Sequence, residues 1–287
     1  MIAVVVPVYN GADVLATTVP AVLALDGIDE WVWVDDGSTD DTAGQIERLI
    51  RDRPAARLVR LDPNRGRSAA RNAGIAGTTA PIVVCLDTDV EPAPDTALAL
   101  ADAARQRGAV ASVTRLDPVL TNPSDPYQDY LAHHPRGPGP AHPPGAPLDW
   151  RFFLGGACAV RREALGRAGG FREDVRYGED TALGCALARH DPDGLRLAPA
   201  SVRLHGVGTL DQALRNASEF GQALPALQSV CASGTAHRLA RLQAWAPWTR
   251  PAAQAARLLV DRLPAGRGRR KAVRYLLALT ILSARRG

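Results

Sequence analysis

The sequence has little of what marks membrane-spanning, secreted or zinc-binding proteins. No apolar run in its 287 residues approaches the roughly 18 residues that a membrane-spanning helix needs, so we expect none. The first residues, 1–7, have no basic stretch and no cleavage site, which argues against a signal peptide. The four cysteines show no CxxC spacing, which favours free thiols in a reducing, cytoplasmic compartment over a zinc site.

The charge is unevenly spread along the chain. Residues 238–287 contain 12 basic side chains and one acid, Asp261, so this tail carries +11. The remaining 22 of 34 basic and 29 of 30 acidic residues give the body a net charge of −7. A basic tail on an acidic body predicts an anionic partner, for which membrane lipid, nucleic acid and an acidic protein all fit the charge. A solvated helical surface is the alternative.

Apolar, strand-like runs alternate with helical patterns through the first half of the chain. Such alternation is typical of βαβ units, and runs that are apolar throughout indicate strands covered on both faces. We therefore expect an α/β fold, doubly wound around a mostly parallel central sheet with helices on both faces. The expected strands are 2–6, 31–34, 57–61, 82–86 and 110–114, and the expected helices are 12–24, 42–51, 68–76 and 95–107.

The second half of the chain is less regular. Residues 117–147 are rich in Pro and Gly, which predicts a long loop, and such loops in compact domains are more often functional than idle. Helices are expected at 162–168 and 179–189, with short strands near 195–197 and 202–205. From about residue 210 the pattern is helical. We therefore divide the chain into a domain of residues 1–209 and a basic helical extension, 210–287.

Acidic residues follow two of the expected strands directly. Asp35 and Asp36 follow one strand, and Asp87 and Asp89 follow another. Ligands of doubly wound sheets bind outside the carboxyl ends of the strands, so we expect these acids at a binding site. A turn-forming role would explain Asp36 but not the whole set. The Asp87-Thr88-Asp89 segment has the spacing of a carboxylate pair for Mg²⁺ or Mn²⁺.

Three arginines, Arg65, Arg67 and Arg71, stand at the start of the helix expected at 68–76. Cations near a helix N-terminus are unfavourable for the helix itself, so an anionic ligand explains them better than a structural role does. Solvent exposure is the alternative for Arg67.

Seven short motifs follow one another along the chain. They are VVVPVYN (4–10), VDDGSTD (34–40), NRG (64–66) with ARN (70–72), LDTD (86–89), GGA (155–157), GGF (169–171) and GED (178–180). In order and spacing they resemble the family 2 glycosyltransferases over about residues 1–205. The resemblance implies the GT-A fold, with residues 1–115 as the nucleotide-binding half and 116–209 as the acceptor-binding half. It also implies inverting, metal-dependent transfer of a sugar from a nucleotide-diphosphate sugar to an acceptor hydroxyl.

The resemblance assigns roles on the donor side of the site. Asp36 would contact the nucleotide base, and a carboxylate that accepts an imide N–H favours uracil, hence a UDP-sugar. Asp89 would ligate the metal that bridges the diphosphate, and Asp87 would face the ribose. The other donor-side positions are Pro7, Tyr9, Asn10, Arg65, Arg71 and Thr88.

On the acceptor side, Asp180 would be the general base and Glu179 a supporting acceptor contact. An acid in the first turn of a helix is stabilised as the anion, which suits a base, although helix capping alone is the alternative. His205 matches a position where some members have a metal ligand, and a structural or solvent-facing histidine is the alternative. The acceptor-binding positions are Gly155, Gly156 and Ala157.

Two features depart from patterns found in the family. Arg172 and Glu173 follow the GGF motif where many relatives have Asp-Glu, and the QxxRW motif of processive synthases is absent. We therefore expect a non-processive enzyme. The alternatives are an inactive nucleotide-sugar-binding protein, which the intact Asp89 and Asp180 argue against, and a nucleotidyltransferase, whose Gly-rich phosphate loop is missing after the first strand.

The apolar segment 271–283 in the tail is flanked by arginines and is too short to span a bilayer. It would either dock at the inner face of the membrane or cover the catalytic domain as ordinary core through Leu276, Leu277, Ile281 and Leu282, with the flanking arginines solvated. No nucleic-acid partner is expected. The sugar and the acceptor are not specified by any motif.

Overall fold

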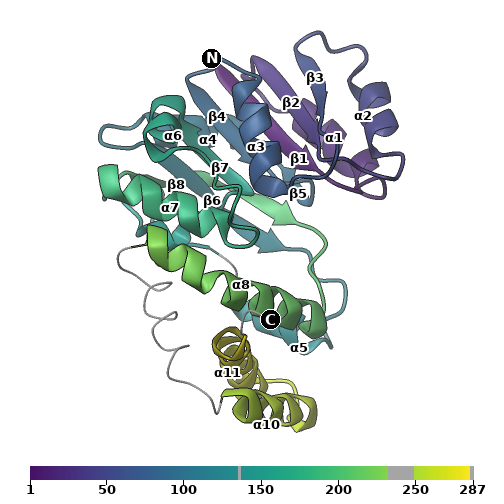
Figure 1. Cartoon of the computed structure of the whole chain (residues 1–287), viewed down its shortest axis with the longest axis vertical. Helices are drawn as coiled ribbons and strands as arrows, with labels where there is room; N and C mark the ends of the chain where they lie inside the picture. Colours follow the sequence, from purple (N-terminus) through teal and green to yellow (C-terminus); the bar gives the residue numbers. More distant parts are fainter. Residues whose placement is uncertain (135–136, 232–248, 285–287) are drawn as a thin grey trace. The chain divides into compact units, whose positions relative to one another are not determined.

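The computed structural model describes residues 1–134, 137–231 and 249–284, which belong to two compact units (Figure 1). Unit 1 contains residues 1–117 and 137–204, and unit 2 contains residues 118–136 and 205–287. The segment 118–136 therefore groups with the C-terminal region, although it precedes the second half of unit 1 in the chain.

Unit 1 is built around an eight-stranded sheet of order β3-β2-β1-β4-β7-β6-β8-β5. β1 pairs in parallel with β2 and β4, and β2 with β3, whereas β7 is antiparallel to β4 and β6, and β5 to β8. The parallel pairs thus come from the half of the chain in which strands and helices alternate. The strands are β1 (Ile2–Val8), β2 (Glu30–Asp35), β3 (Ala56–Arg60), β4 (Ile82–Leu86), β5 (Val90–Pro92), β6 (Ala111–Pro118), β7 (Ala157–Arg161) and β8 (Leu195–Leu204).

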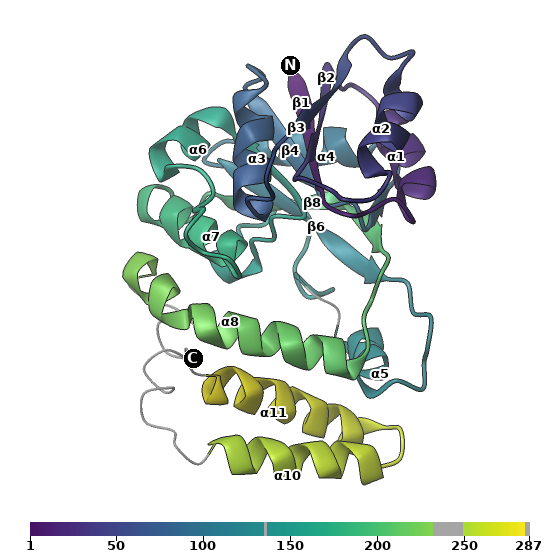
Figure 2. The same cartoon turned by 45° about the vertical axis from the view of Figure 1, so that its right-hand side comes forward.

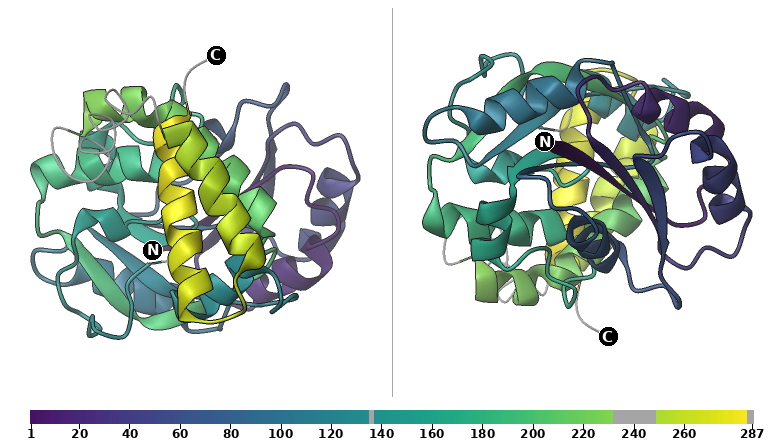
Figure 3. Two further views of the ribbon diagram at one scale, coloured as in Figure 1. Left: turned by 90° about the horizontal axis from the view of Figure 1, so that it is seen from below. Right: turned by 90° about the horizontal axis from the view of Figure 1, so that it is seen from above.

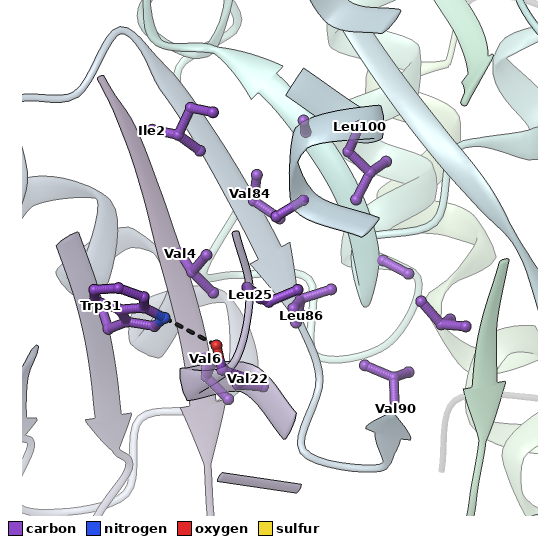
Figure 4. Close-up of a cluster of buried hydrophobic side chains, with 14 of the residues drawn as sticks. Ile2, Val4, Val6, Val22, Leu25, Trp31, Val84, Leu86, Val90 and Leu100 are labelled. Carbon is purple, nitrogen blue, oxygen red and sulfur yellow. Dashed lines mark hydrogen bonds between the residues drawn. The ribbon is translucent and has the colours of Figure 1, made fainter. Parts of the chain in front are cut away.

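Helices cover both faces of this sheet. Val4 and Val6 of β1 pack with α1 (Leu15–Leu23), α2 (Thr42–Ile50) and α4 (Thr96–Arg105), whereas Val5 packs with α3 (Arg67–Ala76), α6 (Arg162–Ala168) and α7 (Glu179–His190). Figure 4 shows part of the first cluster, where the indole N–H of Trp31 donates to the carbonyl of Val22 at 2.9 Å. Coverage on both faces explains the apolar strands and confirms the expected α/β fold, whereas the sheet is mixed and not mostly parallel.

Two expectations for the second half were wrong. The expected loop contains helix α5 (Pro126–His133), whose N-cap Asp125 accepts hydrogen bonds from the backbone N–H groups of Tyr127 and Gln128. Asp followed by Pro is a helix-start signal, which the Pro- and Gly-rich composition of the segment concealed. The two short strands expected near 195–205 form one strand, β8, because the extended backbone continues through Pro199.

Unit 2 is helical in its described residues. It contains α5, α8 (Leu210–Val230), α10 (Thr249–Arg262) and α11 (Arg267–Ser283), and α11 packs against the other three (Figure 2). Leu276 lies in the core of unit 2 and Leu277 packs against it, so these two residues are core as expected, but the core is that of unit 2. Ile281 and Leu282 are partly buried. The expectation that the flanking arginines are solvated was wrong for Arg269 and Arg270, which are mostly buried and form ion pairs with Asp129. Among the described residues, no helix combines the length and apolar character needed to cross a bilayer.

The cysteines only partly match the expectation of free thiols. Cys85 and Cys158 are free and buried, but Cys185 and Cys231 are each disulfide-bonded. Disulfide formation depends on which sulfur atoms meet in the folded chain, and sequence spacing alone does not reveal this. The cysteines therefore no longer support a reducing compartment.

Gly74 of α3 lies where this helix packs against the sheet. A Cβ atom at this position would come within 2.3 Å of Val5 Cγ1 and 3.0 Å of Val34 Cγ2. Gly74→Ala should therefore lower the free energy of unfolding by roughly 1–3 kcal/mol through overpacking, as measured by urea denaturation. Gly166 in α6 is the matched control, because a Cβ there would meet nothing within 4 Å. Equal destabilisation by Gly166→Ala would contradict the packing argument.

Candidate active site

The loops that follow β1 and β2 are tied together at the carboxyl edge of the parallel strands. The side-chain oxygen of Asn10 accepts a hydrogen bond from the backbone N–H of Thr39 at 2.8 Å, and the backbone N–H of Asn10 donates to Ser38 Oγ at 2.9 Å. Asn10 adopts a left-handed backbone conformation with φ 47°, which asparagine tolerates better than most residues. Pro7 is buried in β1, and Tyr9 directly after this strand is exposed.

Asp36 is buried and holds the segment that leads into α3. Its two carboxylate oxygens accept hydrogen bonds from the backbone N–H groups of Arg65 and Gly66, both at 2.8 Å. These bonds give Asp36 a structural role that the sequence did not reveal. A carboxylate oxygen can accept more than one hydrogen bond, so the expected contact with a nucleotide base stays a prediction.

Arg71 of α3 lies at the centre of the site. The residue is only 1% exposed, and its guanidinium donates to Asp87 Oδ1 at 2.6 Å and to Glu179 Oε1 at 3.0 Å. The Arg71 Cζ atom also lies 5.2 Å from the centroid of the Phe171 ring. Burial favours the neutral form of Arg71, but the charges of Asp87 and Glu179 outweigh it and raise the pKa of Arg71. Arg71 thus links the loop after β4 to the first residue of α7.

The other two arginines near the start of α3 also contact acids within the chain. Arg67 pairs with Glu179 at 3.3 Å, and Arg65 pairs with Glu173 at 2.9 Å. We expected an anionic ligand to account for these cations, but carboxylates from the segment 173–179 already contact them. The pairs join residues more than 100 positions apart, which local sequence patterns cannot predict.

Asp180 stands in the first turn of α7, after Gly178, whose φ of 81° is typical of glycine. The Asp180 carboxylate is partly buried and accepts a hydrogen bond from the backbone N–H of Thr181 at 2.7 Å. Burial, together with the neighbouring Glu179 carboxylate, raises the pKa of Asp180 above its ordinary value. A carboxylate with a raised pKa is a stronger proton acceptor, as a general base requires.

The expected acceptor motif, 155–157, lies beside both acidic groups. A Cβ atom at Gly155 would come within 3.4 Å of Asp180 Cβ, and one at Gly156 within 2.2 Å of Asp87 Oδ2. A side chain at Gly156 would therefore occupy the space of the Asp87 carboxylate. Ala157, the first residue of β7, is buried.

The expected metal ligands, Asp89 and His205, adjoin the same end of the antiparallel β5–β8 pair, where Val90 lies opposite Leu204. Asp89 directly precedes β5 and is partly buried, as is Thr88, and His205 directly follows β8. Across residues 1–134, 137–231 and 249–284, no group of three or more His, Cys, Asp or Glu side chains could hold a metal ion. Mg²⁺ and Mn²⁺ also bind through one or two carboxylates plus substrate phosphates, and Asp89 fits a site of that kind. Both ligand assignments stay predictions.

Asn72 is a site residue that the sequence interpretation did not name. Its side chain donates to the carbonyl of Phe171 at 2.8 Å and accepts from the Phe171 N–H at 2.9 Å. This pair fixes the GGF segment, 169–171, against α3. Asn72 belongs to the ARN motif, so the motif was the available signal, although its partner was not evident.

Comparison with known proteins supports the motif interpretation. The model of the family described as Glycosyl transferase family 2 matches residues 3–169, more than half of the chain. The succinoglycan biosynthesis protein ExoO of Rhizobium meliloti (strain 1021) is 37% identical over 116 residues, which cover 40% of this chain and 33% of that protein. An undecaprenyl-phosphate 4-deoxy-4-formamido-L-arabinose transferase of Sodalis glossinidius is 32% identical over 120 residues, 40% of this chain and 36% of that protein. The chain thus matches about a third of the length of these relatives.

Solved structures show the same fold. A mannosyltransferase, PcManGT, from Pyrobaculum calidifontis in complex with GDP-Man and Mn²⁺ aligns with a TM-score of 0.65 and 24% identity, covering 97% of this chain and 85% of that one. S. aureus TarS residues 1–349 in complex with UDP-GlcNAc align with a TM-score of 0.61 and 15% identity, covering 98% and 88%. These likenesses confirm the expected GT-A fold.

Removal of the Arg71 charge should destabilise the protein. Arg71→Met leaves the buried Glu179 and the partly buried Asp87 without their shared cation, so the free energy of unfolding should fall by roughly 3–5 kcal/mol. Arg65→Met is the matched control, because it breaks the exposed pair with Glu173 and should cost less than about 1 kcal/mol. Urea denaturation of both variants tests the difference, and similar losses would show that burial does not set the cost.

Proposed function

The chain belongs to glycosyl transferase family 2, and from this premise we propose that it transfers a sugar from a nucleotide-diphosphate sugar to an acceptor hydroxyl. The observation that carries the proposal is the buried Asp87–Arg71–Glu179 ion-pair chain, which joins the expected donor side to the helix that bears Asp180. Donor and acceptor must meet at one place for direct transfer, and these ion pairs connect the donor side of the site to its acceptor side. An inactive binding protein would have no need of the adjacent base.

On the donor side, we assign a UDP-sugar to the edge formed by the loops after β1, β2 and β4. Tyr9 is 51% exposed at the end of β1 and is free to cover a base, while Pro7 and Asn10 shape its loop. The remaining lone pairs of Asp36 suit a uracil N–H. The TarS structure contains UDP-GlcNAc and the PcManGT structure contains GDP-Man, which supports a nucleotide-sugar donor.

A thermal-shift screen of nucleotide sugars with Mn²⁺ or Mg²⁺ identifies the base of the donor, since a ligand that binds the native state raises the stability of the protein.

We assign Asp89 as a ligand of Mn²⁺ or Mg²⁺, with His205 as a second ligand. The antiparallel register pairs Val90 of β5 with Leu204 of β8, and these residues directly follow Asp89 and precede His205 in the chain. The PcManGT structure contains Mn²⁺. Such an ion neutralises negative charge on a leaving diphosphate. Asp87, held by Arg71, then faces the ribose together with Thr88.

We assign Asp180 as the general base for an inverting, non-processive transfer. Its raised pKa suits removal of the acceptor hydroxyl proton, and Gly155 adds no side chain in front of it. Glu179, which is engaged by Arg67 and Arg71, fixes the start of α7 and so the position of the base. The segment 155–157 is the proposed acceptor contact, within the acceptor-binding half 116–209, and residues 1–115 form the donor-binding half.

The acceptor class is proposed from the relatives. Several of them are named undecaprenyl-phosphate 4-deoxy-4-formamido-L-arabinose transferases, which favours a lipid-linked acceptor. From such an acceptor we propose a reaction at the inner face of the membrane, with the protein in the cytoplasm; the disulfide-bonded Cys185 and Cys231 give this location no support. No nucleic-acid partner is proposed.

Asp89→Ala should abolish sugar transfer and the metal dependence of donor binding, because the diphosphate loses its bridging cation. Isothermal titration of UDP with and without Mn²⁺ measures this dependence. Asp52→Ala is the control, because Asp52 is exposed between α2 and β3 at the opposite edge of the sheet. An unchanged metal dependence in Asp89→Ala would remove Asp89 from the site.

Asp180→Asn should cut turnover by roughly 10²-fold or more while leaving donor binding near normal. In the unmodified protein, the rate should fall on the acid side as the pH drops through the raised pKa of Asp180, because the protonated form cannot accept a proton. The variant should lose this acid limb. It should also unfold no more easily at neutral pH, because the ionised carboxylate is disfavoured by burial. A preserved acid limb in Asp180→Asn would show that another group is the base.

A further inference from the structure

Helices α10 and α11 form a basic hairpin in unit 2, residues 249–284, whose charges fall into two groups. The hairpin contains eight basic side chains and one acid. Three of the basic side chains form ion pairs with carboxylates of unit 2, and these pairs connect helices within the unit. They join Arg257 to Asp211 at 2.6 Å and to Asp261 at 3.2 Å, and they join Arg269 and Arg270 to Asp129 at 3.3 and 3.2 Å.

The other five basic side chains are exposed. In the part of the chain that the structure describes, none of them forms an ion pair, so no carboxylate there neutralises their charge. Clustered like charges repel one another, which destabilises the fold unless an anionic surface binds them. These side chains are Arg250, Arg262, Arg267, Lys271 and Arg274.

Large apolar side chains are exposed on the same hairpin. Leu258 is 57%, Leu259 50% and Tyr275 58% exposed, and they are the large apolar residues of unit 2 that stand out to solvent among those described. The Lys271 ammonium lies 5.9 Å from the centroid of the Tyr275 ring. Basic and apolar groups therefore occur together, one helical turn apart on α11.

The outward side chains of α11 recur at helical spacing. Arg267 lies four positions before Lys271, and Arg274 and Tyr275 lie three and four positions after it. All four are exposed, so they share one face of the helix. The opposite face carries Ala272, Val273 and Leu276, which are buried in the unit 2 core. The apolar stripe that the sequence suggested for membrane contact is therefore core, and a different face is available. The two helices lie side by side in Figures 2 and 3.

We propose that the exposed side chains of α10 and α11 dock on the surface of an anionic lipid bilayer. Exposed Arg and Lys side chains attract anionic headgroups, while Leu258, Leu259 and Tyr275 enter the boundary between headgroups and acyl chains. Exposed leucines fit lipid better than nucleic acid, which is held by cations and stacking aromatics. The inference rests on unit 2 alone and does not depend on the proposed sugar transfer.

Co-sedimentation of the full-length chain with vesicles tests the proposal. The protein should pellet with vesicles of phosphatidylcholine mixed with phosphatidylglycerol, and should stay in the supernatant with phosphatidylcholine alone. Added salt should weaken the binding, because it screens the charges. Absence of the protein from the anionic pellet would overturn the proposal. Binding of a random-sequence oligonucleotide without vesicle binding would overturn it too, and would indicate a nucleic-acid surface instead.

Variants separate the two contributions. The triple change Arg267→Gln, Lys271→Gln and Arg274→Gln should lower vesicle affinity by roughly 10- to 100-fold. The pair Leu258→Ser and Leu259→Ser should lower it severalfold and keep the salt dependence.

Matched controls lie in unit 1. They are the exposed pair Arg51→Gln and Arg53→Gln, and the exposed Leu49→Ser, all of which should bind vesicles like the unmodified chain. Circular dichroism melting establishes that each variant folds, and the single change Lys271→Gln replaces the triple change if the latter unfolds. Equal losses in the unit 1 controls, or unchanged binding of both hairpin variants, would refute the assigned surface.

Discussion

The guanidinium of Arg71 must be matched by carboxylates, because an unpaired charge in a protein interior costs several kcal/mol. Asp87 comes to it from the end of β4 and Glu179 from the start of α7, so three separate elements are held at one point. Much of the surrounding arrangement follows from this constraint. Gly156 leaves room for the Asp87 carboxylate, and Asn72 holds the GGF segment against α3, which keeps the ring of Phe171 beside the guanidinium.

The same constraint separates the roles of two adjacent acids. Glu179 forms ion pairs with Arg67 and Arg71, whereas the Asp180 carboxylate accepts hydrogen bonds from the backbone N–H and the hydroxyl of Thr181. Burial and the negative charge of Glu179 then raise the pKa of Asp180. Environment, not residue type, thus distinguishes a structural acid from one suited to proton transfer, as in other enzymes with paired carboxylates.

Local patterns predicted the first half of the fold well, because parallel strands covered on both faces must be apolar and must alternate with helices. They failed for β5, which has three residues, and for α5, whose start signal lies in a Pro-rich segment. Motif spacing located the acids of the site and Arg71, but not their partners. Arg71 and Glu179 are 108 positions apart, and only the folded chain brings them together. The same holds for the bonded state of Cys185 and Cys231.

The strand order has a consequence for synthesis of the chain on the ribosome. β8 stands between β6 and β5 in the sheet, yet it is the last of the eight strands to be translated. At ordinary elongation rates, β5 therefore emerges on the order of ten seconds before the strand that pairs with it. During that interval the edges of β5 and β6 that later pair with β8 have no partner strand. Unpaired strand edges of this kind are sites at which another chain can pair.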